Sequence, residues 1–187
     1  MSEIMSFNQR ILHEGENQEE SGEKPGKGKS PTYVVKCGDI FSSTMEGLED
    51  CAPCDWVKTG GSRISSFDSS GKLTGDVKIS GKDPMVCMRY GPWGPVLQEY
   101  MYTGTKLDQI SVYRVMDINR EKIKIQELNY YTCLIKTYDQ EADKILFTFC
   151  FVRLEDLQIA RDQKGKKLGQ NGMMFDFTTL EAKPFTE

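Results

Sequence analysis

The chain has 187 residues, of which 38% are hydrophobic and 10% aromatic, which is enough apolar material for one sizeable core. The formal net charge is −4 and the pI is about 5.2. Because this excess of negative charge repels nucleic acid and anionic membrane surfaces, we expect no nucleic-acid partner. No apolar run approaches the roughly 20 residues of a membrane span, so membrane insertion is not expected either.

Residues 1–31 differ in composition from the rest of the chain. They are rich in Glu, Lys, Gly, Ser and Gln, a composition that does not form a packed core. We predict a polar N-terminal tail at 1–31 and a single β-barrel domain at 32–187. The tail lacks the basic-then-apolar order of a signal peptide, so the protein is expected to begin in the cytoplasm. The stretch "GKGKS", Gly26–Ser30, lacks the full spacing of a phosphate-binding loop and is interpreted as a charged linker.

The first part of the predicted domain contains few regular patterns. Residues 32–37, "TYVVKC", predict a first strand. Residues 39–75 are rich in Gly, Ser and Asp and are expected to form mostly loop, with one short strand near 55–57. Residues 76–80, "DVKIS", alternate between polar and apolar side chains, which predicts another strand.

A short helix is predicted after these strands. Pro92 and Pro95 can occupy its first turn, and Gly104 stands where a left-handed C-cap belongs. Between them, four apolar residues recur at helical spacing: Val96, Leu97, Tyr100 and Met101. We expect an amphipathic helix of at most three turns, with Leu97 and Tyr100 facing the core.

Apolar patterns predict four strand regions after the helix: residues 109–116, 121–139, 144–160 and 173–182. In the second region, apolar residues occupy odd positions up to Ile125 and even positions from Leu128, a phase change that indicates a bulge. Residues 164–172, "KGKKLGQNG", are predicted to form a basic, Gly-rich hairpin loop. Antiparallel strands of this number, bent within a strand, indicate a mainly β fold: a small antiparallel β-barrel capped by the one short α-helix.

The predicted strand at 144–160 is apolar on both of its faces. One face belongs to the candidate barrel core, which consists of Leu97, Tyr100, Phe147 and Phe149. The other face is a candidate subunit interface, because one short helix cannot cover it and a second copy of the chain can. Its residues are Leu146, Val152 and Leu154.

The sequence offers little catalytic or metal-binding chemistry. Its six cysteines are expected to be free thiols, and "CAPC" at Cys51–Cys54 lacks the second half of a zinc site. The one histidine, His13, lies in the predicted tail. Glu155 and Asp156 are adjacent in a strand, so their carboxylates point to opposite faces and cannot act on one substrate. We predict no enzyme, no metal and no cofactor.

Three consecutive stretches carry a resemblance to a known family: "KDPMVCMRYGPWGPVLQEYMYTGTKLDQISVYRV", "KIKIQELNYYTCLIKTYD" and "KILFTFCFVRLEDLQI". Together they run from Lys82 to Ile159. In the order and type of their elements they resemble the haemolysin-coregulated protein (Hcp) family, the tube subunit of bacterial type VI secretion systems. The family's N-terminal portion matches only loosely, at 32–39, so the chain resembles a divergent member.

The resemblance implies a small β-barrel capped by one helix that assembles into hexameric rings, which stack as a tube inside a contractile sheath. The implied partners are further copies of this chain and the sheath, spike and effector proteins of the apparatus, with effectors carried in the lumen. The implied route is from the cytoplasm to secretion without a signal peptide. The residue patterns leave open a monomeric β-barrel binding module, or a phage-tail-tube-like protein without a role in secretion.

Overall fold

The computed structural model of the protein describes the following residues: 32–41, 45, 47–67, 73–118 and 121–186. The predicted polar tail, with His13 and Gly26–Ser30, lies outside these described residues and stays a prediction. In the described part, nine strands and one helix follow one another in this order: β1 (Tyr33–Cys37), β2 (Cys51–Phe67), β3 (Leu73–Arg89), α2 (Gly94–Thr103), β4 (Leu107–Ile118), β5 (Glu121–Glu141), β6 (Lys144–Cys150), β7 (Arg153–Arg161), β8 (Lys167–Asp176) and β9 (Glu181–Thr186).

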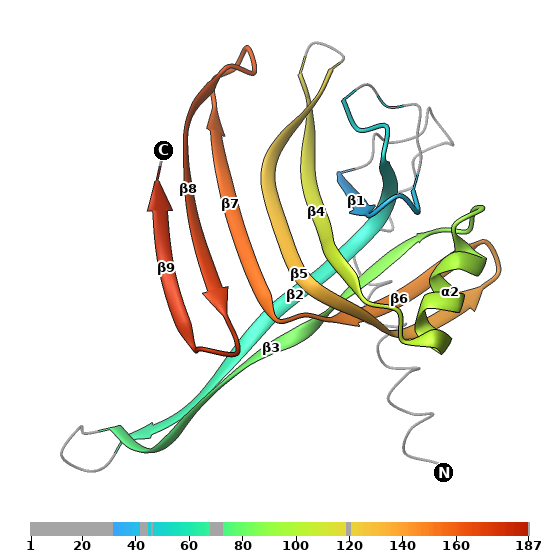
Figure 1. The fold of residues 1–187 in the computed structure, drawn as a ribbon. Helices are drawn as coiled ribbons and strands as arrows, with labels where there is room; N and C mark the ends of the chain where they lie inside the picture. The colour runs from blue at the N-terminus through green and yellow to red at the C-terminus, as the bar shows by residue number, and fades with distance from the viewer. Residues whose placement is uncertain (1–31, 42–44, 46, 68–72, 119–120, 187) are drawn as a thin grey trace, which may run out of the picture.

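Six of the strands close into a ring (Figure 1). The order around it is β4, β1, β2, β3, β6 and β5, and the pairing of β4 with β5 completes the circle. Every neighbouring pair is antiparallel. The predicted fold class, an antiparallel β-barrel with one short helix, is therefore confirmed.

Strands β7, β8 and β9 extend the sheet beyond the ring. Both β6 and β7 pair with β5, and the pairs Leu134 with Cys150 and Tyr131 with Arg153 keep one register across the gap between them. The predicted single strand at 144–160 is thus two strands on one line, interrupted at 151–152. The prediction of one continuous strand was wrong in this detail, because β7 leaves the ring and starts the extension.

The region at 39–75 departs most from the sequence prediction. The described residues between β1 and β2 form turns, as predicted, but from Cys51 onward β2 and β3 form a ribbon of two strands of 17 residues each, which projects from the barrel in Figure 1. Three register shifts interrupt the pairing along its length. Because each shift breaks the two-residue alternation, the sequence shows no continuous strand pattern there.

The last strands also differ from their predictions. The basic loop predicted at 164–172 is shorter, because β8 already begins at Lys167. The strand predicted at 173–182 is divided between β8 and β9 by a turn, in which the Asp176 carboxylate accepts a hydrogen bond from the Thr178 backbone N–H at 2.8 Å. An aspartate that bonds the backbone two residues ahead favours a turn over a continuing strand.

The predicted bulge lies in β5 and is confirmed. Pairing with β4 shifts register between Arg114 and Val115, which face Gln126 and Lys124. Ile125 is the additional residue, at the position where the apolar phase changes. The bulge lets the first half of β5 bend and pair with β4 while its core-facing positions move to the even residues.

The core fills the ring and continues beneath the extension. Tyr130 packs edge-on against Phe149 and Phe151, with ring centroids 5.1 and 4.8 Å apart, and Phe151 contacts Phe177 in the same way at 5.2 Å. β3 passes directly over these rings at Gly81, where a Cβ would lie 2.8 Å from the Phe177 ring. A glycine there lets the base of the ribbon lie against the aromatic side chains.

The predicted helix is confirmed as α2. Pro95 lies in its first turn, and Gly104 ends it with a φ of 63°, in the left-handed region. The Thr105 N–H then donates to the Tyr100 carbonyl at 3.2 Å. Leu97 is the buried residue of its apolar face, with none of its surface exposed. No helix among the described residues is long and apolar enough to cross a membrane.

We predict that Leu97→Ala lowers the free energy of unfolding by about 2–5 kcal/mol, because it removes a fully buried side chain and leaves a cavity. The exposed Glu99→Ala on the same helix is the control and should change it by less than about 0.5 kcal/mol. Urea denaturation followed by circular dichroism measures both. Equal losses for the two variants would contradict the packing of this helix.

Candidate interaction surfaces

The four candidate core residues lie in one hydrophobic cluster or against it. Leu97, Phe147 and Phe149 are fully buried inside the ring. Tyr100 is half-buried and packs against the same cluster from α2. The structure therefore brings these side chains together from the helix and from β6.

The three candidate interface residues are half-buried but do not share one face. Leu146 is on the outer side of β6, opposite Cys87 of β3 and Asp139 of β5. Leu154 pairs with Tyr130 and packs against the core cluster. The phase of the side chains reverses across the break at 151–152, where Val152 lies, so the constant phase assumed from the sequence was wrong.

An apolar surface lies around Leu146 on the outside of the ring. Trp56, Cys87 and Leu146 form one cross-strand row, and Met85 and Thr148 form the next. We call these five residues the outer barrel face. Apart from Cys87, which is buried, they are half-buried.

Two ion pairs lie at the margin of the outer barrel face. Lys136 binds Asp83 at 2.6 Å, and Lys144 binds Asp55 at 3.5 Å. An apolar centre with a charged margin is the usual composition of a protein–protein contact surface. Among the described residues, the outer barrel face therefore has the composition of a protein contact surface.

A polar cluster on β4 and β5 escaped the sequence analysis. The Ser111 hydroxyl donates to Asn129 Oδ1 at 2.7 Å, and Gln109 Nε2 donates to the same oxygen at 3.1 Å. Ser111 is 1% exposed and Asn129 8% exposed, so their hydrogen bonds satisfy groups that water does not reach. The one signal in the sequence is a serine between Ile110 and Val112 in an apolar strand.

Next to this cluster, β5 and β7 share a second polar contact. The Tyr131 hydroxyl donates to Glu155 Oε2 at 2.6 Å, and the Arg153 guanidinium lies 4.0 Å from the centre of the Tyr131 ring. The pKa of Tyr131 is raised to about 12, mainly because burial removes hydration from the phenol and secondly because of the hydrogen bond to Glu155. The tyrosine is therefore a protonated hydrogen-bond donor at neutral pH.

Glu155 and Asp156 do not form a carboxylate pair, in agreement with the sequence argument. Glu155 accepts the hydrogen bond from Tyr131 on one face of β7. Asp156 accepts hydrogen bonds from Gln126 at 3.0 Å and from Gln158 at 3.1 Å. Since each carboxylate has its own partners, the arrangement is that of a structural hydrogen-bond network.

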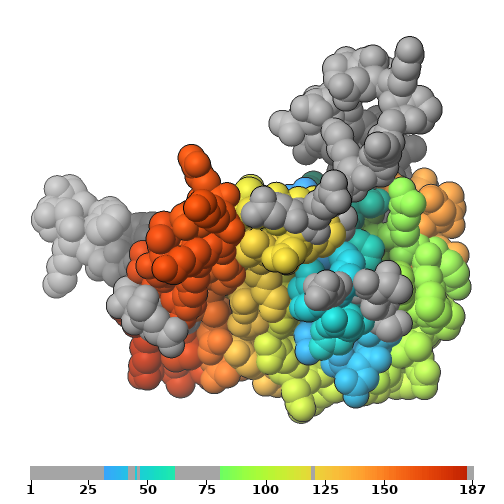
Figure 2. Space-filling view, turned by 90° about the horizontal axis from the view of Figure 1, so that it is seen from above, coloured from blue at the N-terminus to red at the C-terminus, as the bar shows by residue number. Residues whose placement is uncertain are grey.

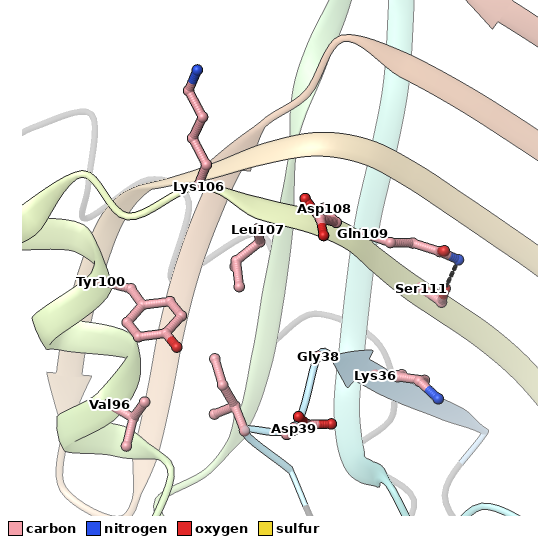
Figure 3. Close-up of a pocket in the computed structure, with 11 residues that line it drawn as sticks. Lys36, Gly38, Asp39, Val96, Tyr100, Lys106, Leu107, Asp108, Gln109 and Ser111 are labelled. Atoms are coloured by element: carbon pink, nitrogen blue, oxygen red, sulfur yellow. Dashed lines mark hydrogen bonds between the residues drawn. The ribbon is translucent and has the colours of Figure 1, made fainter.

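A cavity of about 520 Å³ lies between α2, β4 and the turn that follows β1 (Figure 3). Tyr100 and Leu107 reach toward it, whereas Lys106 points away. The lining also includes Asp39 but contains neither histidine nor cysteine, so it provides no imidazole or thiol for nucleophilic catalysis. Its serine, Ser111, already donates its hydroxyl to Asn129.

The two cysteines of the "CAPC" motif lie in different hydrophobic clusters. Cys54 belongs to the core inside the ring, and Cys51 packs with Val34 and Tyr113 in a second cluster. Burial raises the pKa of the Cys51 thiol to about 11 and raises that of Cys54 further. In the part of the chain that the structure describes, no group of three or more His, Cys, Asp or Glu side chains could hold a metal ion.

Comparison with known proteins identifies the fold. No protein-family profile matches the sequence, and no curated protein matches it. A solved structure of a type six secretion system protein aligns with a TM-score of 0.71 and 12% identity, covering 82% of this chain and 100% of that one. Hcp1 from Salmonella typhimurium aligns with a TM-score of 0.63 and 11% identity, covering 81% of this chain and 97% of that one. The chain has an Hcp-like fold.

A further Hcp1 structure, from the E. coli EAEC 042 pathovar, aligns with a TM-score of 0.57 and 10% identity, covering 83% of this chain and 98% of that one. The resemblance found in the sequence is therefore confirmed as a likeness of fold. The alignments cover nearly the whole of each Hcp structure, so they include more of this chain than the quoted stretches from Lys82 to Ile159. At these identities the likeness establishes the fold alone.

The positions of Cys51 and Cys54 lead to a prediction about metal content. Protein purified without a chelator should contain far less than one zinc per chain, because two thiols in separate hydrophobic clusters cannot bind one ion. Elemental analysis of the wild type and of Cys54→Ser measures this directly. One zinc per chain that is lost in the variant would contradict the separation of the two thiols.

Proposed function

We propose that this protein is the structural tube subunit of a type VI secretion system. In this proposal six copies form a ring, the rings stack into the inner tube, and effectors are carried in the lumen. The observation that supports it most is the Hcp-like fold, which spans nearly the full length of the Hcp structures. The chain acts as a building block and not as an enzyme.

The form of the subunit supports assembly through unlike surfaces. The β2–β3 ribbon projects from the ring, and strands β7–β9 extend the sheet beyond the ring on the same side in Figure 1. A subunit with two different contact surfaces associates head to tail, and such contacts close into rings when the rotation between copies allows it. The outer barrel face provides an apolar surface for the neighbouring copy.

The polar groups of the site support a structural role. Ser111, Asn129, Tyr131 and Glu155 are engaged in hydrogen bonds with one another or with neighbours, and the pKa of Tyr131 is raised. Groups that act as acids or bases in catalysis need a pKa near the working pH. These side chains stabilise the sheet instead.

In this role the partners of the protein belong to the type VI secretion system. These are further copies of the chain and the sheath, spike and effector proteins, and the chain passes from the cytoplasm to the outside without a signal peptide. The cavity beside α2 favours the alternative, a monomeric β-barrel module that binds a ligand between Tyr100 and Leu107.

Electron microscopy of the purified protein in negative stain separates the two functions. The tube-subunit proposal expects rings with a central hole and, at higher concentration, short stacks. Uniform particles of single-subunit size at every concentration would contradict it and favour the monomeric module.

The two sides of β6 generate a prediction about assembly. Phe149→Lys should unfold the chain, because Phe149 is fully buried and a charge there has no partner. Leu146→Lys should leave a folded chain that does not form rings, because this residue is half-buried on the outer barrel face and lies opposite Asp139. Circular dichroism reports folding, and light scattering reports mass.

The contrast between the two variants is the test. If both variants unfold, Leu146 is part of the core and the outer barrel face is not an assembly surface. If Leu146→Lys remains folded and keeps the wild-type mass, neighbouring copies do not contact this face.

A further inference from the structure

We propose that two oppositely charged hairpins bind each other between successive copies of the chain. The acidic one joins β5 to β6, and the basic one joins β7 to β8. The inference rests on the proposed function in one respect, that copies of the chain associate. It specifies which surfaces of the two copies meet, and it predicts that the association depends on salt.

The two hairpins lie at opposite ends of one line of strands. β6 and β7 run in a single register along β5, so the β5–β6 hairpin precedes this line and the β7–β8 hairpin follows it. In Figure 1 the two hairpins lie on different sides of the molecule, and Figure 2 shows the same separation from above. They cannot meet within one copy, so a contact between them requires two copies.

The acidic hairpin carries Asp139, Glu141 and Asp143, all exposed. Among the described residues none of these carboxylates has an ion-pair partner. The nearby lysines are engaged elsewhere: Lys136 binds Asp83, and Lys144 binds Asp55. The negative charge of this hairpin is therefore available to a partner.

The basic hairpin carries the exposed residues Lys164 and Lys166. Its one carboxylate, that of Asp162, accepts hydrogen bonds from the backbone N–H groups of both lysines, each at 2.9 Å. Arg161 donates to the carbonyl of Gly165 at 2.9 Å and thereby ties the loop to its own strand. The loop is thus ordered by its own groups, while the ammonium groups of the two lysines remain without an ion-pair partner among the described residues.

Each hairpin also lies beside an exposed apolar side chain. Tyr90 is 45% exposed, and its backbone N–H donates to the Asp143 carbonyl at 2.6 Å. Leu168 is 68% exposed and follows the basic loop in β8. An aromatic or aliphatic anchor surrounded by charges is a common arrangement at a protein interface. The two surfaces therefore match in apolar content and oppose each other in charge.

A second copy of this chain is the partner that these surfaces fit. The acidic hairpin requires a basic partner surface, and the basic hairpin requires an acidic one. A second copy of the chain carries both. The net charge of the chain is only −4. Because the two surfaces differ, the contact is head to tail and can be repeated from copy to copy. Opposite charges at such a contact mainly orient the copies and exclude the wrong register.

Charge reversal tests the proposal. The acidic variant is Glu141→Lys with Asp143→Lys, and the basic variant is Lys164→Glu with Lys166→Glu. Sedimentation velocity of each should show self-association weakened on the order of tenfold or more, because like charges then face each other. An equal mixture of the two variants should associate again, since each altered hairpin matches the altered hairpin of the other variant.

Two controls separate this contact from a general effect of charge. Glu99→Lys and Lys106→Glu change exposed residues outside both hairpins and should associate like the wild type. Association of the wild type should weaken as ionic strength rises from about 0.05 to about 0.5 M, because salt screens exposed charges. The salt measurement uses the wild type, so it tests the proposal even if a substituted chain does not fold.

The outcomes distinguish this inference from the proposed function. Rings that form in both charge-reversal variants as in the wild type, with no effect of salt, overturn the hairpin contact and leave the tube subunit in place. A wild type that stays monomeric at every concentration and in the electron microscope overturns the tube subunit as well.

Discussion

The rest of the structure depends on one strand, β5, which pairs with three others. Its residues 126–131 lie between β4 and β7, and its residues 134–141 pair with β6. The pairing with β4 closes the ring, and the pairing with β7 starts the extension. A strand has only two edges, and one edge of β5 pairs with β4. Strands β6 and β7 therefore pair one after the other along the second edge, and the break at 151–152 separates them.

The elements that could be predicted are those whose local chemistry determines them. The helix follows from Pro95 and Gly104, and the bulge in β5 follows from the phase change after Ile125. The β2–β3 ribbon could not be predicted, because three register shifts interrupt its pairing and break the two-residue alternation by which a strand is recognised. The break after Cys150 has no local signal, since it depends on the position of β7 beside β5.

The residues of the candidate surfaces also divide into those that could be predicted from the sequence and those that could not. Phe147 and Phe149 could be assigned to a core from their size, and they are fully buried. The grouping of Leu146 with Leu154 assumed one side-chain phase along a single strand. The two residues lie in separate strands, β6 and β7, and the side-chain phase reverses between them. The Ser111 and Asn129 cluster joins residues 18 positions apart through strand register, which no sequence spacing indicates. Buried polar pairs of this kind fix register and stiffen a sheet.

In the proposed function, this Hcp-like chain is a repeating subunit of a ring. Native mass spectrometry of the purified full chain tests it most directly, because it counts the copies in the assembly. The account predicts a dominant species of six chains, each of 21.3 kDa. A single chain as the only species, under conditions in which the protein is folded by circular dichroism, would contradict it.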